Sequence, residues 1–149
     1  MTRYEHTQIG YVIIWVTGGA IALIAAVSIS APSPDRGVLF LVALLLLIVL
    51  PLFYKLTIKI DDEMLRACFG IGLISKKVPL AQIAACEPMR VPWWSGWGMR
   101  FTLTPFGWGW LYNVSGWDAV AIKLRNGREF ALGTDDPHGL AEAIQAAIP

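Results

Sequence analysis

Charge is scarce in this chain. Asp, Glu, Lys and Arg make up only 15% of its 149 residues, and the formal net charge is +1. The positive charges form no patch of the kind that phosphate backbones require. We therefore expect no nucleic-acid partner.

Residues that carry catalysis or bind metals are also few. The two histidines, His6 and His138, fall near the N-terminus and in the last segment, where we expect a frayed end and a helix surface. No Cys/His spacing matches a zinc site. Ser115 and Asp118 are close in sequence but lack the surroundings of an activated nucleophile. We expect a non-enzymatic protein without a cofactor or a metal.

Two uncharged runs dominate the first third of the chain, at residues 7–34 and 37–54. A bilayer core of about 30 Å requires about 20 apolar residues in a helix. The runs predict membrane-spanning helices at about 9–29 and 38–56, with Lys55 extending its ammonium into the headgroups. A signal peptide cleaved near residues 28–30 is the alternative for the first run, although the run exceeds the roughly 7–15 apolar residues of such a segment.

The link at residues 31–37 contains two prolines and a glycine, so the chain turns and re-enters as a hairpin that occupies residues 1–56. Gly18, Ala22 and Ala26 recur every four residues on one helix face. Small residues at this spacing allow close helix packing, so this face is expected to contact the second helix or a neighbouring copy. The alternative is that small residues are simply common in membrane helices.

The distribution of Lys and Arg predicts the orientation. Arg3, Lys55, Lys59 and Arg66 flank the helices on the side of the termini, whereas the link holds only Arg36. This bias favours a multi-pass protein of the inner (plasma) membrane with its termini and C-terminal domain in the cytoplasm.

The two cysteines, Cys68 and Cys86, fit free thiols in that reducing compartment. If the domain faced outward, one disulfide between them would be possible.

From about residue 56 the pattern changes to alternation of apolar and polar residues, which predicts short antiparallel strands. Asn126 and Gly127 predict a two-residue type I′ turn, and Asp136 followed by Pro137 predicts the start of a helix. The expected strands lie at about 55–60, 64–69, 73–78, 83–89, 99–103, 110–114, 120–124 and 130–132, and the apolar face of the helix comprises Leu140, Ile144, Ala147 and Ile148. These elements favour a mainly β sandwich or open barrel that the C-terminal helix closes.

Three segments resemble the bacterial pleckstrin-homology-like (PH-like) membrane proteins, which have a hairpin of membrane helices followed by a PH-like barrel. They are Gly96-Trp97-Gly98-Met99-Arg100, residues 110–116 (WLYNVSG) and residues 132–137 (LGTDDP). The resemblance implies a seven-stranded PH-like barrel with a C-terminal helix at residues 57–149, and no particular activity. Phosphoinositide binding is not expected, because the first strand turns, at 61–63 and 70–72, are acidic and uncharged respectively.

Five of the seven tryptophans lie within residues 93–110 (WWSGWGMRFTLTPFGWGW). They form a packed core, a belt at the membrane surface or an aromatic cage for a cation. We expect Trp108, Trp110 and Trp117 in the core, and Trp93, Trp94 and Trp97 in a loop at headgroup depth. Arg90 and Arg100 flank this loop and either contact anionic headgroups or stay solvated.

These patterns favour a membrane-anchored PH-like accessory module that binds membrane lipid or a protein partner at the cytoplasmic face. The alternative is a structural subunit of a larger membrane complex, assembled with itself or another membrane protein through the helix face of Gly18, Ala22 and Ala26.

Overall fold

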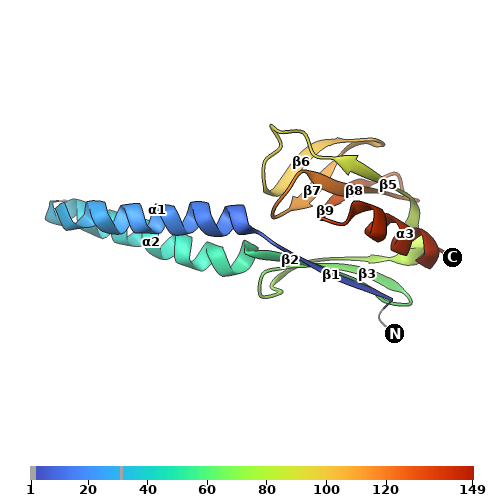
Figure 1. The fold of residues 1–149 in the computed structure, drawn as a ribbon, viewed down its shortest axis with the longest axis horizontal. Coiled ribbons are helices and arrows are strands. Elements are labelled where there is room, and N and C mark those ends of the chain that lie inside the picture. The colour runs from blue at the N-terminus through green and yellow to red at the C-terminus, as the bar shows by residue number, and fades with distance from the viewer. Residues whose placement is uncertain (1–2, 31) are drawn as a thin grey trace.

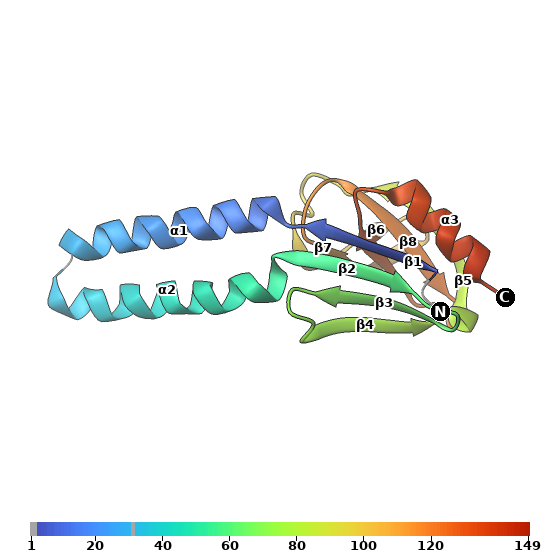
Figure 2. The same cartoon turned by 60° about the horizontal axis from the view of Figure 1, so that its bottom comes forward.

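The computed structural model describes residues 3–30 and 32–149, which form a hairpin of helices that projects from one end of a β sandwich (Figures 1 and 2). In chain order the elements are β1 (Tyr4–Ile9), α1 (Tyr11–Ser30), α2 (Ser33–Phe53), β2 (Lys55–Ile60), β3 (Met64–Phe69), β4 (Ile74–Pro79), a 3₁₀ turn (Leu80–Gln82), β5 (Ile83–Arg90), β6 (Gly98–Thr104), β7 (Gly107–Asn113), β8 (Asp118–Leu124), β9 (Glu129–Gly133) and α3 (Pro137–Ala147).

The two apolar helices α1 and α2 pack against each other and bury none of their described residues. At 20 and 21 residues, each is about 30 Å long, which is sufficient to cross a bilayer core. A core helix of a soluble protein would be buried, so this exposure agrees with the prediction of two membrane spans.

The link between the helices is shorter than residues 31–37, so that prediction is wrong. α2 begins at Ser33 because Pro34 suits the first helical turn and Asp35 complements the positive end of the helix dipole. Arg36 donates to the carbonyl of Ile29 at the end of α1 (3.2 Å). Ala31, where the expected link starts, lies outside the described residues.

Strand β1 precedes the first helix, and the sequence patterns missed it. It pairs with β2 from Tyr4↔Ile60 to Ile9↔Lys55, so α1 and α2 leave the sheet from neighbouring strands. The expectation that His6 lies at a frayed end is wrong, because His6 is within β1. Cleavage near residues 28–30 would remove this edge strand, which argues against the signal-peptide alternative.

The strands form two sheets, ordered β1-β2-β3-β4 and β5-β8-β9-β7-β6. No described strand pair joins the sheets, so the domain is a sandwich and the barrel that the resemblance implies is not closed. It has nine described strands, and β7 pairs with β9 in parallel. The expectations of seven or eight strands and of purely antiparallel pairing are therefore wrong.

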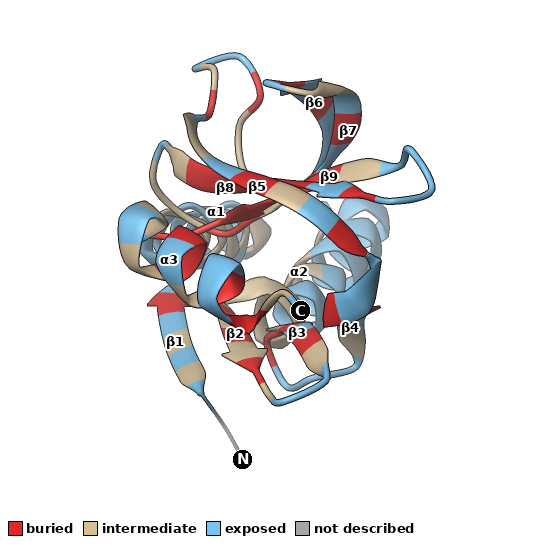
Figure 3. Cartoon of the chain, turned by 90° about the vertical axis from the view of Figure 1, so that its right-hand side faces the viewer, coloured by how far each residue is buried: buried red, intermediate tan, exposed pale blue. Residues whose placement is uncertain are grey.

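The core lies between the sheets, where red buried segments face each other in Figure 3. Its largest fully buried side chains come from both sheets, the 3₁₀ turn and α3: Leu56, Ile58, Ile60, Leu65, Phe69, Leu80, Ile83, Ile122, Leu132, Leu140 and Ile144. Leu111 belongs to a second, smaller cluster with Val91, Ala119 and Ala131. Helix α3 contacts β2, β5 and β8 and therefore closes one side of the sandwich. As predicted, Asp136 begins this helix, since its carboxylate accepts from the N–H of Gly139 (3.0 Å).

The β8–β9 connection differs from the expected two-residue type I′ turn. That turn requires positive φ at both central residues, but only Gly127 has one (83°). Leu124 N–H donates to the carbonyl of Arg128 (2.8 Å), and the Asn126 side chain accepts from the N–H of Arg128 (3.0 Å). The result is a three-residue loop in which a single glycine supplies the left-handed conformation.

Candidate functional site

Two loops project at the end of the sandwich from which the helices emerge. They are the β3–β4 turn at residues 70–73 and the β5–β6 loop at residues 91–97, and both lie beside the start of the helix hairpin in two views (Figures 1 and 2). Hydrogen bonds and ring contacts fix this placement.

The β3–β4 turn packs on the last turn of α2. Gly70 N–H donates to the carbonyl of Lys55 (2.8 Å), and Ile71 N–H donates to the carbonyl of Pro51 (3.2 Å). Gly70 has a φ of 50°, and a Cβ there would lie 2.0 Å from the Pro51 oxygen, so only glycine fits. The turn leaves the side chains of Ile71 and Leu73 exposed beside the helix.

The β5–β6 loop is attached to the base of α1 through the β7–β8 loop. Val91 N–H donates to the carbonyl of Trp117 (2.6 Å), and the rings of Trp97 and Trp117 pack with centroids 5.4 Å apart. Gln8, two residues before Gly10, donates to the carbonyl of Ser115 (2.8 Å). This series of contacts holds residues 91–97 at the level where α1 begins.

The apolar side chains exposed on these two loops, together with Trp117 of the β7–β8 loop, form a surface that we call the proximal rim: Ile71, Leu73, Trp93, Trp94 and Trp117. Trp93 and Trp94 are 78% and 69% exposed, and their rings contact edge to face (6.0 Å). Tyr11 and Trp15, in the first turns of α1, are exposed next to this end. Aromatic rings collect at headgroup depth in membrane proteins, so the rim and the helix base have the composition of a membrane interface.

Charge is distributed unevenly along the sandwich. Lys55, Arg90 and Arg100 lie near the rim, whereas the acidic turn at 61–63 lies at the far end of β2 and β3. Arg90 is highly exposed, with a long contact to Asp118 (3.9 Å). Arg100 donates to the carbonyl of Trp97 (3.2 Å), which leaves most of its guanidinium in solvent. Basic side chains therefore lie beside the rim, whereas the aspartates of the far turn pair with Arg3 and Arg66.

The structure divides the tryptophans differently from the sequence prediction. Trp93 and Trp94 are exposed in a loop, as expected, but Trp97 is half-buried against Trp117. The placement of Trp108, Trp110 and Trp117 in the core is wrong, because all three are exposed. Trp108 and Trp110 lie on β7, outside the proximal rim but lining one hollow with Trp94.

The second Gly-Trp-Gly segment is explained by the neighbouring strand. A Cβ on Gly109 would lie 2.7 Å from the backbone oxygen of Glu129, and one on Gly107 would lie 2.6 Å from its carboxylate. Thr104 donates to the same carboxylate (2.7 Å). The glycines therefore make room for β9, while Trp108 between them points to the opposite face of β7.

The helix face of Gly18, Ala22 and Ala26 is exposed. A Cβ added to Gly18 meets no atom within 4 Å, so the expectation that this face packs on α2 is wrong. The interhelix contact instead uses the partly buried side of α1 that includes Ile21 and Ile24. The small-residue face is free for a neighbouring copy or another helix.

A polar group ties β1 to the segment before α3. His6 Nε2 contacts Asp135 Oδ1, and the Tyr4 hydroxyl donates to Asp136 (3.4 Å). Partial burial, together with the nearby Asp136 carboxylate, raises the pKa of Tyr4 to about 12. Within residues 3–30 and 32–149, no group of three or more His, Cys, Asp or Glu side chains is placed to hold a metal ion.

The thiols differ in surroundings. Cys86 is buried and lies 3.6 Å from the carbonyl of Ala141, and its burial raises the pKa of the thiol. Cys68 lies on the outer face of β3 and is partly exposed. Both are free, and no disulfide joins them.

The sequence patterns missed Ile71 and Leu73 as members of the rim. The uncharged turn Gly70-Ile71-Gly72 carries the signal, since an apolar residue at a turn tip has no core to enter, but only the fold shows that this tip lies beside α2.

Comparison of the chain with models of known families, with curated proteins and with solved structures gives no match.

Proposed function

We propose that this chain is a bacterial PH-like module of the inner (plasma) membrane that performs no chemistry and rests on the cytoplasmic lipid surface. The two helices span the bilayer, and both termini and the sandwich lie in the cytoplasm. The proximal rim enters the headgroup region and fixes the sandwich against the membrane.

One observation carries this proposal: the exposed apolar loop tips gather at the single end of the sandwich where the helices begin. Trp93, Trp94, Ile71 and Leu73 come from two separate loops, yet all lie beside the base of the hairpin. Exposed large apolar patches on soluble surfaces are uncommon and mark interaction sites. A bilayer that contains α1 and α2 places lipid headgroups against these side chains.

Charge supports the same surface. Lys55, Arg90 and Arg100 lie near the rim, and an anionic leaflet attracts basic residues with about 1 kcal/mol each. The bias of Lys and Arg toward the side of the termini supports the cytoplasmic orientation.

Depth-dependent quenching of tryptophan fluorescence tests the proposal. The full chain is placed in bilayers whose lipids carry bromine near the headgroups, because a fragment starting at residue 56 would lack β1. We expect strong quenching that falls when Trp93 and Trp94 are both replaced by Phe. The matched control replaces Trp108 and Trp110 by Phe, and the fluorescence of Trp93 and Trp94 should still be quenched in this variant. Equal quenching before and after the Trp93 and Trp94 substitutions would refute contact of the rim with lipid.

A second candidate, a structural subunit of a larger membrane complex, is favoured by the uncovered face of Gly18, Ala22 and Ala26. Gly18→Leu should reduce self-association or co-purification of a partner in mild detergent, since the larger side chain prevents close helix approach. Gly37→Leu is the control, because a Cβ there also meets nothing within 4 Å. Unchanged association in Gly18→Leu would remove this candidate.

A further inference from the structure

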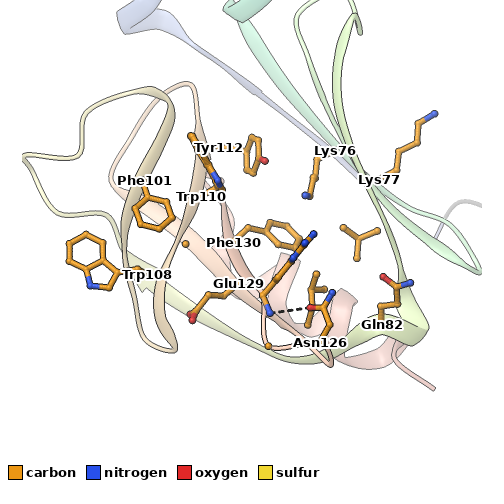
Figure 4. A pocket seen from close by; sticks show the side chains of 15 residues that line it. Lys76, Lys77, Gln82, Phe101, Trp108, Trp110, Tyr112, Asn126, Glu129 and Phe130 are labelled. Carbon is orange, nitrogen blue, oxygen red and sulfur yellow. Dashed lines mark hydrogen bonds between the residues drawn. The ribbon is translucent and has the colours of Figure 1, made fainter.

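The two sheets differ in width, and part of the wider sheet has no opposite layer. The sheet of β1 to β4 has four strands, and the sheet that ends in β7 and β6 has five. Strand β4 is the edge of the narrower sheet on the side of β7 and β6. A cleft of about 660 Å³ opens between this edge and the β6–β7 hairpin (Figure 4).

The strand registers identify the face of the hairpin that borders this cleft. Trp110 pairs with Phe130, and Tyr112 pairs with Leu132, so these four side chains share the face that is directed toward β1 to β4. Phe101 and Leu103 on β6 pair with Trp110 and Trp108, so they share the same face. The aromatic surface of the hairpin is thus a continuation of the interior of the sandwich.

Burial falls steadily where β4 ends. Phe130 is 3% exposed under the narrower sheet, Trp110 is 51% exposed and Trp108 is 64% exposed. Tyr112 marks the boundary, since its ring contacts both Phe69 of β3 and Phe130 (6.1 and 6.3 Å between centroids). Phe101 stacks on Trp108 at an interplanar angle of 13°. These rings lie side by side on one face of the wider sheet, and beyond β4 no described strand covers them.

The cleft is cationic as well as aromatic. Lys76 projects from β4 into it and lies over the ring of Phe130, and Lys77 and Arg128 also line it. No described carboxylate pairs with Lys76, Lys77 or Arg128, and the carboxylate that lines the cleft, Glu129, accepts from Thr104. A ligand that enters therefore meets unpaired positive charge.

We propose that this cleft binds an extended, acidic segment of a partner protein, which adds as a fifth strand to the edge of β4. β4 pairs with β3 on one side only, so alternate residues along it direct backbone N–H and C=O groups to its other edge, where such a strand would add. Alternate side chains of the segment would cover Trp110, Phe101 and Trp108, and the acidic residues on its opposite face would meet Lys77. The inward-facing Lys76 opposes unselective edge pairing, and Lys77 on the outer face favours a segment whose outward residues are acidic.

A lipid surface does not account for this face. Strand β6 begins beside the proximal loop and runs away from the helices (Figure 1), and the Leu103–Trp108 pair lies near its far end. At about 3.3 Å per residue, the five steps from Gly98 to Leu103 span roughly 16 Å. The proposal thus goes beyond membrane attachment and does not depend on it.

The test measures binding of labelled peptides to the full chain in lipid nanodiscs. The probe is a peptide of about seven residues in which valine alternates with glutamate. We expect saturable binding that weakens about tenfold with Trp110→Ala, as for an aromatic anchor of an interface. It should weaken similarly when alternate peptide nitrogens are methylated, because backbone pairing is then blocked. Lys77→Glu should shift the preference toward a valine–lysine peptide.

Matched controls separate the possible occupants. A peptide of the same composition, with its valines and glutamates in two blocks, should bind weakly. Replacing Trp93 by Ala should leave binding unchanged, because Trp93 does not line the cleft. Absence of saturable binding, or equal binding of the methylated and block peptides, would overturn the proposal. A dimer of the chain that Trp110→Ala dissociates would also overturn it, and would identify a second copy as the occupant. Failure of rim quenching would leave these results unaffected.

Discussion

The ammonium nitrogen of Lys76 lies 5.5 Å from the centroid of the Phe130 ring, at the edge where the narrower sheet stops. Lys76 shares a strand face with Ile74 and Val78, which is the face directed to the core, because it pairs with buried Ala67. The aromatic ring stabilises the ammonium at this position, and the cleft leaves it accessible to solvent. Lys76 therefore lies where the apolar interior ends.

Replacing Lys76 by Leu should therefore remove a barrier to edge pairing. We expect Lys76→Leu to unfold at a slightly higher temperature, because an apolar side chain suits the core face, and to associate more strongly as concentration rises. Thermal unfolding and sedimentation in detergent measure these effects. Lys123→Leu is the control, since Lys123 also lies over a ring, that of Phe106 (5.9 Å). Equal association of the two variants would contradict the role assigned to Lys76.

Gly109→Ala should destabilise the sandwich by about 1–3 kcal/mol, the usual cost of overpacking. The added Cβ would meet the backbone of Glu129 at 2.7 Å, and a paired strand cannot move aside easily. Denaturant unfolding of the full chain gives the free energy of unfolding. Gly18→Ala, where a Cβ meets open space, should be neutral or stabilising. A neutral Gly109→Ala would show that β7 and β9 lie farther apart than described.

The Tyr4 phenol should affect stability at high pH. Its folded pKa of about 12 exceeds the ordinary tyrosine pKa of 10.0, so folding favours the protonated form. This stabilising contribution is complete below pH 10 and is lost as the pH rises through about 12. The free energy of unfolding of the wild type should therefore fall more over this pH range than that of Tyr4→Phe. Parallel pH dependence of the two proteins would argue that Tyr4 titrates normally.

The two thiols should react at different rates. Cys68 is partly exposed, whereas Cys86 is buried and its pKa is raised, which lowers its thiolate fraction. We expect a thiol-alkylating reagent to modify Cys68 first in the folded chain, and to modify both after denaturation. Mass spectrometry of the Cys68→Ser and Cys86→Ser variants assigns the sites. Faster modification of Cys86 would indicate that α3 opens readily from the sheet.

The sequence predicted the elements whose determinants are local. Long apolar runs identified α1 and α2, alternation identified most strands, and Asp136 with Pro137 identified the start of α3. It missed β1, whose residues are mostly polar and are ordered by their pairing with β2, some fifty residues later in the chain. It also misjudged the turn at Asn126, because the register of β8 and β9 selects a three-residue loop there.

The positions of the tryptophans show why the candidate surfaces could not be predicted from local sequence patterns. Trp93 and Trp94 lie in a loop that its proline and glycine neighbours already mark. Trp108 and Trp110 have the alternation of core residues, and they do lie on the face that is directed inward. They are exposed because the opposite sheet ends at β4. The local sequence of β7 carries no information about how many strands the opposite sheet has.

The amino-acid sequence alone determined that two apolar helices precede a β-rich domain with a closing helix, since hydrophobic length, alternation and capping act over a few neighbouring residues. Only the tertiary structure decided that β1 joins the sheet across the helix hairpin, that the apolar loop tips meet beside the helix base, and that an aromatic face is left without a covering strand. These features depend on strand order and register, which arise from contacts between residues far apart in the chain.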